Sequence, residues 1–240
     1  MSATRRERES GHWAAAYHRL VFTETDRRPP IPAAISGPGV VGIGRRLDPA
    51  AVLPIGEGLA KGGVKAFEIT LGDPDAQEAI SRLADRFPEG SELLLGAGTV
   101  LDPGAAEAAI GAGARFLVMP HLDEELVRWA AARGIPTFPG AFTPTEILAA
   151  WRAGASAVKL FPSSVVGPAF IREFRGPFPD IPLIPTGGVT LESAPGFIAA
   201  GAVAVGLGSW LMAAGDAGTV EVRARSVVEA VARARSESAV

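Results

Sequence analysis

The sequence predicts a (β/α)8 TIM barrel preceded by an N-terminal extension, and three observations support this fold class. From Val40 onward, short β-type runs alternate eight times with Ala-rich amphipathic stretches within about 200 residues. Small-residue breaks end several of the helical stretches just before the next strand, where glycine supplies the left-handed conformation that stops a helix. A doubly wound sheet is the main alternative, but its early glycine-rich fingerprint is absent.

The elements follow in chain order. The predicted strands are Val40–Gly44, Val64–Leu71, Leu93–Ala97, Phe116–Met119, Pro136–Phe138, Ala157–Phe161, Leu183–Pro185 and Val203–Leu207. The predicted helices are Pro49–Ala60, Asp75–Arg86, Gly104–Ile110, Asp123–Arg133, Thr145–Arg152, Val166–Phe174, Leu191–Ala200 and Val220–Ala234. Capping pairs mark three helix starts, at Asp48-Pro49, Asp102-Pro103 and Thr143-Pro144. Glycine breaks follow at Gly62-Gly63, Gly111-Ala112-Gly113, Gly134, Gly154 and Gly201.

The segment before the barrel has a different character. Residues 2–32 carry mixed charge and end in a proline-rich stretch, and Trp13–Phe22 contains enough apolar residues for one or two docked helical turns. We predict a flexible or loosely docked extension over residues 1–36 and a barrel domain over residues 37–240.

Composition excludes several classes of protein. The 240 residues include 23 basic and 26 acidic side chains, a formal net charge of −3, so nothing favours nucleic acid or an anionic membrane surface as a partner. The absence of cysteine excludes disulfides, zinc–thiolate sites, iron–sulfur clusters and thiol catalysis. Two of the three histidines, His12 and His18, lie in the extension, which argues against a multi-histidine metal site. No run approaches the ~20 apolar residues of a membrane span and no signal peptide is present, so we predict a cytoplasmic protein.

Two opposite charges point into the predicted barrel. In the second strand Phe67 and Ile69 share one face and Glu68 the other, and the large apolar residues should face the helices. In the sixth strand the same alternation turns Lys159 inward. Buried ions are costly unless they are paired or solvated, so the two groups should lie near each other. The alternatives are a salt bridge that plugs the barrel and a reactive pair.

The reactive alternative has a specific chemistry. An amine in an apolar pocket loses its proton more readily and becomes a nucleophile, and a neighbouring carboxylate can move protons. Imine formation on a ketone requires this pairing. The chain has only three lysines, and the other two, Lys61 and Lys65, flank a glycine break and are predicted to lie on the surface.

The ends of other strands carry candidate binding residues. Gly187-Gly188 and Gly206-Leu207-Gly208-Ser209 follow the last two strands, where barrels commonly bind phosphate through backbone amides. Thr99 is either a carboxylate ligand or a turn residue, and Arg45 is either an anion clamp or a surface arginine. His121 is predicted to be a rim residue.

Four motifs carry a resemblance to a known family. Phe67-Glu68-Ile69-Thr70-Leu71, Gly96-Ala97-Gly98-Thr99-Val100, Val158-Lys159-Leu160-Phe161-Pro162 and Pro185-Thr186-Gly187-Gly188 resemble the bacterial KDPG/KHG aldolase family. Its members are class I aldolases of 2-keto-3-deoxy-6-phosphogluconate and 4-hydroxy-2-oxoglutarate. The resemblance runs in order from about Val40 to the end of the chain. It implies a usually trimeric barrel that needs neither a metal nor an organic cofactor.

The resemblance also implies a role for each matching residue. Lys159 would form the Schiff base with the keto acid, and Glu68 would be the general acid and base. The binding residues would be Thr99, Pro120 and Phe161 around the pyruvate part, and Gly187, Gly188 and Ser209 around the phosphate. The substrates would be pyruvate and a phosphorylated keto acid.

The chain departs from the family pattern after the second strand. Gluconate-type members carry an arginine there, whereas Leu71 is followed by Gly72-Asp73, and we take Arg45 as the compensating cation. The run from Lys159 to Ser164 also resembles the 2-dehydro-3-deoxy-6-phosphogalactonate aldolases. We therefore predict cleavage of the gluconate-type substrate, with 4-hydroxy-2-oxoglutarate as a second substrate, and keep the galactonate epimer as an alternative. Two further alternatives are a barrel isomerase or synthase and a phospho-ligand-binding barrel without aldolase turnover.

Overall fold

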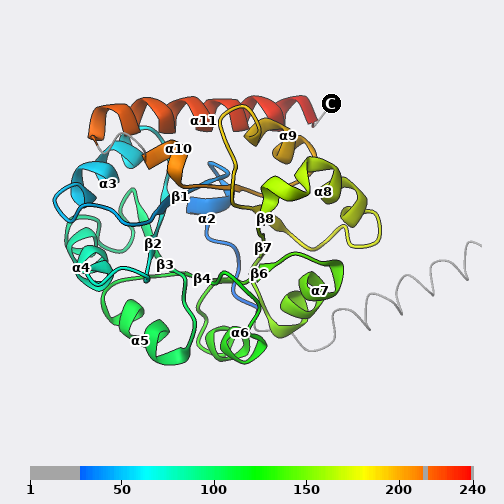
Figure 1. The fold of residues 1–240 in the computed structure, drawn as a ribbon, viewed down its shortest axis with the longest axis horizontal. Helices are drawn as coiled ribbons and strands as arrows, with labels where there is room; N and C mark the ends of the chain where they lie inside the picture. Colours follow the sequence, from blue (N-terminus) through cyan, green and yellow to red (C-terminus); the bar gives the residue numbers. More distant parts are fainter. Residues whose placement is uncertain (1–27, 213–215, 239–240) are drawn as a thin grey trace, which may run out of the picture.

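The computed structural model describes residues 28–212 and 216–238 (Figure 1). The predicted helical turns at Trp13–Phe22, together with His12 and His18, lie outside the described residues. None of the helices formed by the described residues is long and apolar enough to cross a membrane.

All strand pairs in the described part of the chain are parallel. The strands are β1 Val40–Gly44, β2 Ala66–Thr70, β3 Leu94–Gly98, β4 Leu117–Val118, β5 Thr137–Phe138, β6 Gly140–Ala141, β7 Val158–Leu160, β8 Leu183–Pro185 and β9 Val205–Leu207. They form one sheet in the order β5-β4-β3-β2-β1-β9 and a second in the order β6-β7-β8. An isolated parallel bridge between Thr186 and Gly206 links the end of β8 to β9. The fold is thus an α/β fold with a curled parallel sheet.

Strand β6 was not predicted, and Pro139 explains why the fifth strand divides. Proline has no N–H to donate, so the ladder is interrupted between β5 and β6. The Pro139 carbonyl still accepts a hydrogen bond from the Lys159 N–H at 2.9 Å. The chain therefore continues in the same direction, and β6 pairs with β7 through Gly140 and Lys159.

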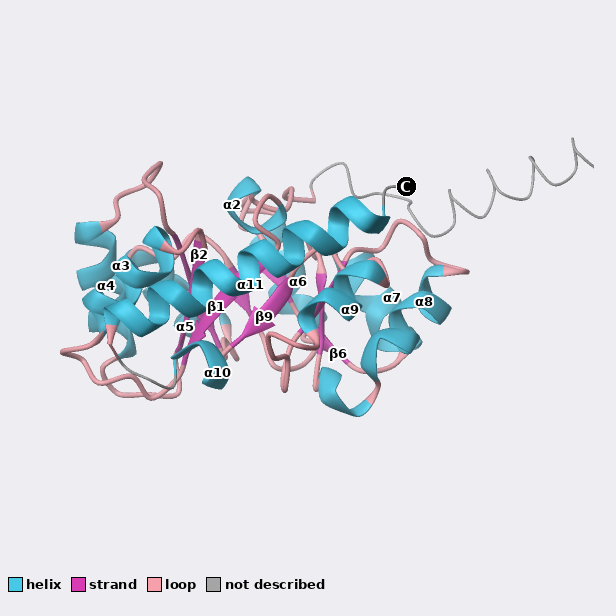
Figure 2. Ribbon diagram, turned by 90° about the horizontal axis from the view of Figure 1, so that it is seen from above, coloured by secondary structure: helices cyan, strands magenta, loops and turns pink. Residues whose placement is uncertain are grey.

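Helices surround the strands, as the view from above shows (Figure 2). Their bounds are α2 Ala33–Ser36, α3 Val52–Lys61, α4 Ala76–Arg86, α5 Pro103–Gly111, α6 Glu124–Ala131, α7 Pro144–Ala153, the 3-10 turn η1 Ser163–Val165, α8 Gly167–Arg175, α9 Ala194–Ala199, α10 Ser209–Met212 and α11 Ala217–Ser238. Each of the eight predicted helices is present, and α2 and α10 are additional. The long helix α11 packs across α3 and α9 (Figure 1).

The predicted capping signals are confirmed at two of three helix starts. The Asp102 carboxylate accepts the Ala105 N–H at 2.8 Å, and Thr143 begins α7 with a capping box. Asp48 instead accepts the Ala50 N–H at 2.8 Å within a turn, so α3 begins later than predicted. Positive φ angles occur at the predicted helix stops, namely Gly63, Gly113, Gly134, Gly154 and Gly201.

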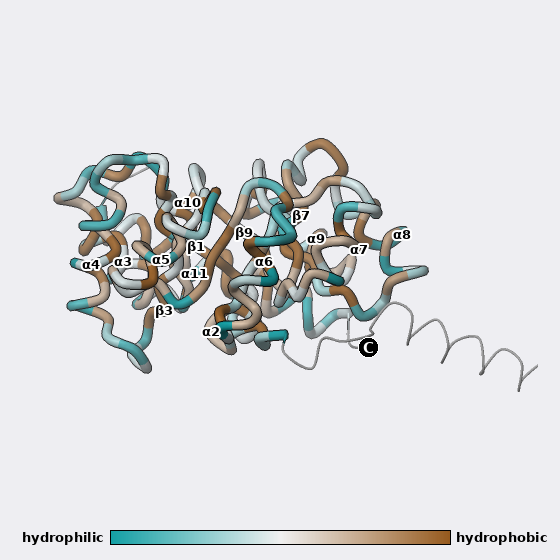
Figure 3. Tube along the Cα trace, turned by 90° about the horizontal axis from the view of Figure 1, so that it is seen from below, coloured by the Kyte–Doolittle hydropathy of each residue, from teal (hydrophilic) through white to brown (hydrophobic). Residues whose placement is uncertain are grey.

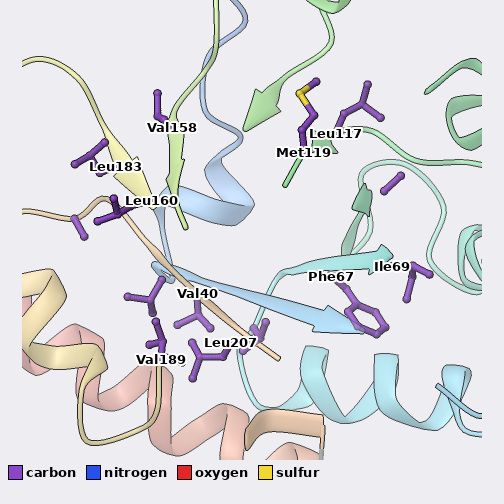
Figure 4. Close-up of a cluster of buried hydrophobic side chains, with 14 of the residues drawn as sticks. Val40, Phe67, Ile69, Leu117, Met119, Val158, Leu160, Leu183, Val189 and Leu207 are labelled. Carbon is purple, nitrogen blue, oxygen red and sulfur yellow. The ribbon is translucent and has the colours of Figure 1, made fainter. Parts of the chain in front are cut away.

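The core has two layers, because alternate residues of each strand face opposite sides. Apolar side chains such as Phe67, Ile69, Val158 and Leu160 fill the layer between strands and helices (Figure 4). A smaller cluster lies on the inner side of the strands, and Ile35 of α2 is fully buried in it. The hydropathy colouring follows this arrangement, with hydrophobic strands inside and hydrophilic stretches on outer loops (Figure 3). Glu68 and Lys159 therefore face inward, as predicted.

Arg28, within the predicted extension, contacts helix α7 of the α/β domain. The Arg28 guanidinium lies 3.3 Å from the centroid of the Trp151 ring and donates hydrogen bonds to the carbonyls of Trp151 and Ala155. The carbonyls at the end of α7 thereby gain a cationic partner. The domain boundary at residue 36 stays a prediction.

Candidate active site

A cavity of about 360 Å³ opens at the carboxyl ends of the strands. Its lining includes six predicted site residues: Arg45, Lys159, Phe161, Gly187, Gly188 and Ser209. A larger cavity of about 430 Å³ lies at the opposite ends of the strands, beside α2. Its only charged side chains, Arg115 and Glu89, already form an ion pair at 3.2 Å, so it offers no comparable chemistry.

Glu68 lies at the bottom of the site. Its side chain is 2% exposed, and burial raises the pKa of its carboxyl, with the nearby charges of Lys159 and Arg45 acting in the opposite direction. A side chain at position 98 would overlap the Glu68 carboxylate, so a larger residue there would displace Glu68. No described residue donates a hydrogen bond to the carboxylate, which leaves its oxygens available to a bound molecule.

Lys159 faces Glu68 across the interior. It is 6% exposed, and its Nζ lies 5.0 Å from the centroid of the Phe161 ring. Both charged groups line a small space of about 10 Å³, which is close to the least that can hold a water molecule. No ion pair joins Lys159 to Glu68 in the described part of the chain, so the salt bridge considered from the sequence is not formed. The two groups instead share the lining of this small space.

Thr99 directly follows β3 and Pro120 lies two residues after β4, and neither lines the cavity or the small space. Thr99 follows Gly98, which the Glu68 carboxylate contacts, and its φ of 58° is left-handed. Non-glycine residues adopt this conformation at a cost of about 1 kcal/mol, and such strain is concentrated at functional sites. The Pro120 carbonyl lies against Gly140, the strand neighbour of Lys159. His121 is exposed, consistent with the predicted rim position.

The glycine turn after β8 presents its backbone to the cavity. Gly187 and Gly188 have φ angles of 87° and 77°. The Gly187 carbonyl accepts hydrogen bonds from the Ser163 hydroxyl at 3.1 Å and the Ser164 N–H at 3.0 Å. No described residue accepts a hydrogen bond from the Gly188 amide, so this amide can bind an anion. Ser209, at the start of α10, lines the same cavity.

Sequence reasoning missed several lining residues, of which Thr186 is the most central. It lines both the larger cavity and the small space between Lys159 and Glu68, and its hydroxyl donates to the Ile184 carbonyl at 3.3 Å. Alternation along β8 could have identified it, because Ile184 and Thr186 share the inward face. Ile43, Thr190 and Trp210 also line the cavity, and no sequence pattern singled them out.

No cluster of three or more His, Asp or Glu residues that could hold a metal ion occurs within residues 28–212 and 216–238. The polar groups of the predicted site residues are one amine, one carboxylate, one guanidinium, two hydroxyls and backbone amides. This arrangement can bind an anionic carbonyl compound and transfer protons to it.

The raised pKa of Glu68 predicts a pH-dependent stability effect. The folded protein retains this carboxyl proton to higher pH than the unfolded chain, whose Glu68 titrates near 4.5. Ionisation in the folded state therefore destabilises the protein as the pH rises above this value. We expect Glu68→Gln to increase the thermal unfolding midpoint at pH 7, with a gain that shrinks toward pH 4. A gain independent of pH would contradict this, and the exposed Glu107→Gln serves as the matched control.

Comparisons with known proteins agree on one family. A family model described as KDPG and KHG aldolase matches residues 39–225. The 2-dehydro-3-deoxy-phosphogluconate aldolase of Pseudomonas aeruginosa is 41% identical over 202 residues, which are 82% of this chain and 89% of the relative. The 2-dehydro-3-deoxy-6-phosphogalactonate aldolase of Escherichia coli is 39% identical over 155 residues, 64% of this chain and 75% of the relative.

One of the similar solved structures contains a covalent reaction intermediate. The KDPG aldolase from Legionella pneumophila, with pyruvate captured at low pH as a covalent carbinolamine intermediate, is similar with a TM-score of 0.69. The sequence identity is 28%, and the match covers 83% of this chain and 95% of that chain.

Proposed function

The chain belongs to the KDPG and KHG aldolase family, and from this premise we propose that it is a class I aldolase that cleaves a 2-keto-3-deoxy-6-phospho sugar acid of the gluconate type to pyruvate and glyceraldehyde 3-phosphate. One observation carries the proposal. Lys159 and Glu68 are the only charged side chains buried in the described part of the chain, and both line one small space below the cavity.

The first half of the reaction forms an imine on Lys159. Its neutral amine attacks the C2 ketone of the substrate and forms a carbinolamine. Glu68, through a water molecule, protonates the carbinolamine oxygen, and this oxygen leaves as water. The resulting iminium withdraws electrons from the C3–C4 bond.

The second half cleaves that bond and releases the products. Glu68 removes the proton of the C4 hydroxyl, the C3–C4 bonding electrons move to the iminium, and glyceraldehyde 3-phosphate departs. The enamine is then protonated at C3, and water hydrolyses the new iminium to pyruvate and the neutral Lys159 amine.

The remaining site residues bind the two ends of the substrate. We assign the pyruvate carboxylate to Thr99, with Pro120 and Phe161 shaping its surroundings. The phosphate is assigned to Gly187, Gly188 and Ser209, which line the cavity, and the unpaired Gly188 amide supports this. Arg45 supplies an additional positive charge at the cavity wall.

The proposed scaffold is a closed (β/α)8 barrel. If β5 and β6 are one strand interrupted at Pro139, the strands occupy eight positions, and the Thr186–Gly206 bridge supports closure between β8 and β9. We also propose a homotrimer, the usual assembly of the family, and a cytoplasmic location.

The galactonate epimer is the second candidate substrate. Gly72 stands where gluconate-type members carry an arginine, and the relative from Escherichia coli is named for the galactonate substrate. The two substrates differ only in the configuration of the sugar chain.

A coupled assay of pyruvate release tests the proposed function. The substrates are the gluconate-type and galactonate-type phospho sugar acids and 4-hydroxy-2-oxoglutarate. We expect the highest kcat/KM with the gluconate type. A preference for the galactonate type would establish the second candidate. Stabilisation by these ligands without pyruvate release would instead indicate a non-catalytic binding protein.

A further inference from the structure

Two residues other than glycine have a positive φ in the described part of the chain, and both follow strands that flank the strand of Glu68. They are Arg46, with a φ of 51°, and Thr99, with a φ of 58°. Arg46 lies just after β1 and Thr99 just after β3, the two strands that flank β2 and its Glu68. Such a conformation persists only where the surrounding structure holds it. Thr99 already has a proposed role, whereas the turn at Arg46 has none.

Asp73 holds the turn at Arg46. Its Oδ2 accepts a hydrogen bond from the Arg46 N–H at 2.7 Å. Asp73 follows β2 closely, so this bond ties the end of β2 to the end of β1. Gly72, which immediately precedes Asp73, is exposed, and a Cβ at this position would meet no atom within 4 Å. The departure from the family pattern at Gly72-Asp73 thus removes one cation and supplies a carboxylate that shapes the neighbouring turn.

Arg45 immediately precedes the residue that forms this turn. The Arg45 side chain lines the cavity that also contains Lys159, and its charge lowers the pKa of Glu68. It is exposed, and no described residue forms an ion pair or side-chain hydrogen bond with it. Among the described residues, the backbone at residues 45 and 46 is therefore the constraint on this side chain that the structure shows.

We propose that Asp73 is a positioning residue that fixes the Arg45–Arg46 turn, so that the Arg45 guanidinium meets an anionic group of the substrate in place of the arginine absent at position 72. This inference rests on the proposed function, because it assigns the partner of Arg45 to the substrate of that site. Asp73 itself contacts the backbone of the turn and not the substrate.

Steady-state kinetics with the phosphorylated keto acid tests the proposal. We expect Asp73→Ala and Arg45→Ala each to raise KM about tenfold with kcat within about twofold, because each weakens a charge-assisted contact to the substrate. Asp73→Asn retains an oxygen acceptor and should restore most of the affinity. In the double variant, KM should be no higher than in Arg45→Ala alone, because Asp73 acts through Arg45.

Asp48 provides a matched control in the same loop. Its carboxylate also accepts a backbone N–H, from Ala50 at 2.8 Å, but it does not hold the turn at Arg46. Asp48→Ala should therefore leave KM unchanged. Additive effects of the Asp73 and Arg45 substitutions, or an unchanged KM in Asp73→Ala when Arg45→Ala raises it, would overturn the proposal.

A second readout separates this proposal from the proposed function. Lys159 and Arg45 are the charged groups that act on Glu68, so loss or misdirection of Arg45 should raise the Glu68 pKa. Carbon-13 NMR titration of the Glu68 carboxyl, assigned with Glu68→Gln, should show the same upward shift in Arg45→Ala and Asp73→Ala and none in Asp48→Ala. This result would stand even if no aldolase turnover were found. A shift in Arg45→Ala alone would refute the role of Asp73.

Discussion

Replacing Lys159 with alanine or arginine is expected to lower pyruvate release by about 10⁴-fold or more, because the covalent route then has no nucleophile. Alanine removes the amine, whereas arginine keeps the positive charge and a similar length. The guanidinium does not deprotonate near neutral pH, so it cannot form an imine. The arginine variant therefore separates the chemistry of the amine from its charge.

Borohydride reduction in the presence of pyruvate tests the same assignment directly. Peptide mass mapping should locate one reduced pyruvyl adduct on Lys159 of the wild-type protein. The chain's other two lysines, Lys61 and Lys65, are exposed, and their arginine variants should retain both activity and adduct. An adduct that persisted in Lys159→Ala, or cleavage by that variant at the wild-type rate, would refute the Schiff-base role.

Residue alternation predicted the parts of the fold that place the two reactive groups. In β2 the bulky Phe67 and Ile69 require burial against helices, and this turns Glu68 inward. Lys159 lies between Val158 and Leu160 in the same way. These positions follow from a period of two residues, which the sequence displays directly.

Other features depend on contacts between distant segments, which no local pattern encodes. Sequence reasoning could not decide between an ion pair and two separated charges at Glu68 and Lys159, because strand register and side-chain rotamers determine their separation. The bond from Arg46 to Asp73 joins residues 27 positions apart and depends on a left-handed arginine. Both features become visible only when the strand ends are placed side by side.

Replacing Glu68 with glutamine is expected to lower kcat by about 10²- to 10⁴-fold, the usual contribution of a general acid or base. The amide has nearly the same shape as the carboxylate, so its packing against Gly98 is retained. It cannot accept the proton of the substrate's C4 hydroxyl, however, so cleavage of the C3–C4 bond is slowed. Turnover should fall while the amine of Lys159 remains in place.

The two variants should therefore fail at different steps. Glu68→Gln should still yield the borohydride-reduced pyruvyl adduct on Lys159, although more slowly, whereas Lys159→Ala should yield none. Unfolding cannot explain the lost turnover, because removing a buried carboxylate is expected to stabilise the protein at pH 7. If Glu68→Gln cleaved the substrate at the wild-type rate, the Glu68 carboxylate would not be the group that accepts the proton of the C4 hydroxyl. Since no other carboxylate is buried in the described part of the chain, the proton would then have to pass through a hydroxyl such as that of Thr186.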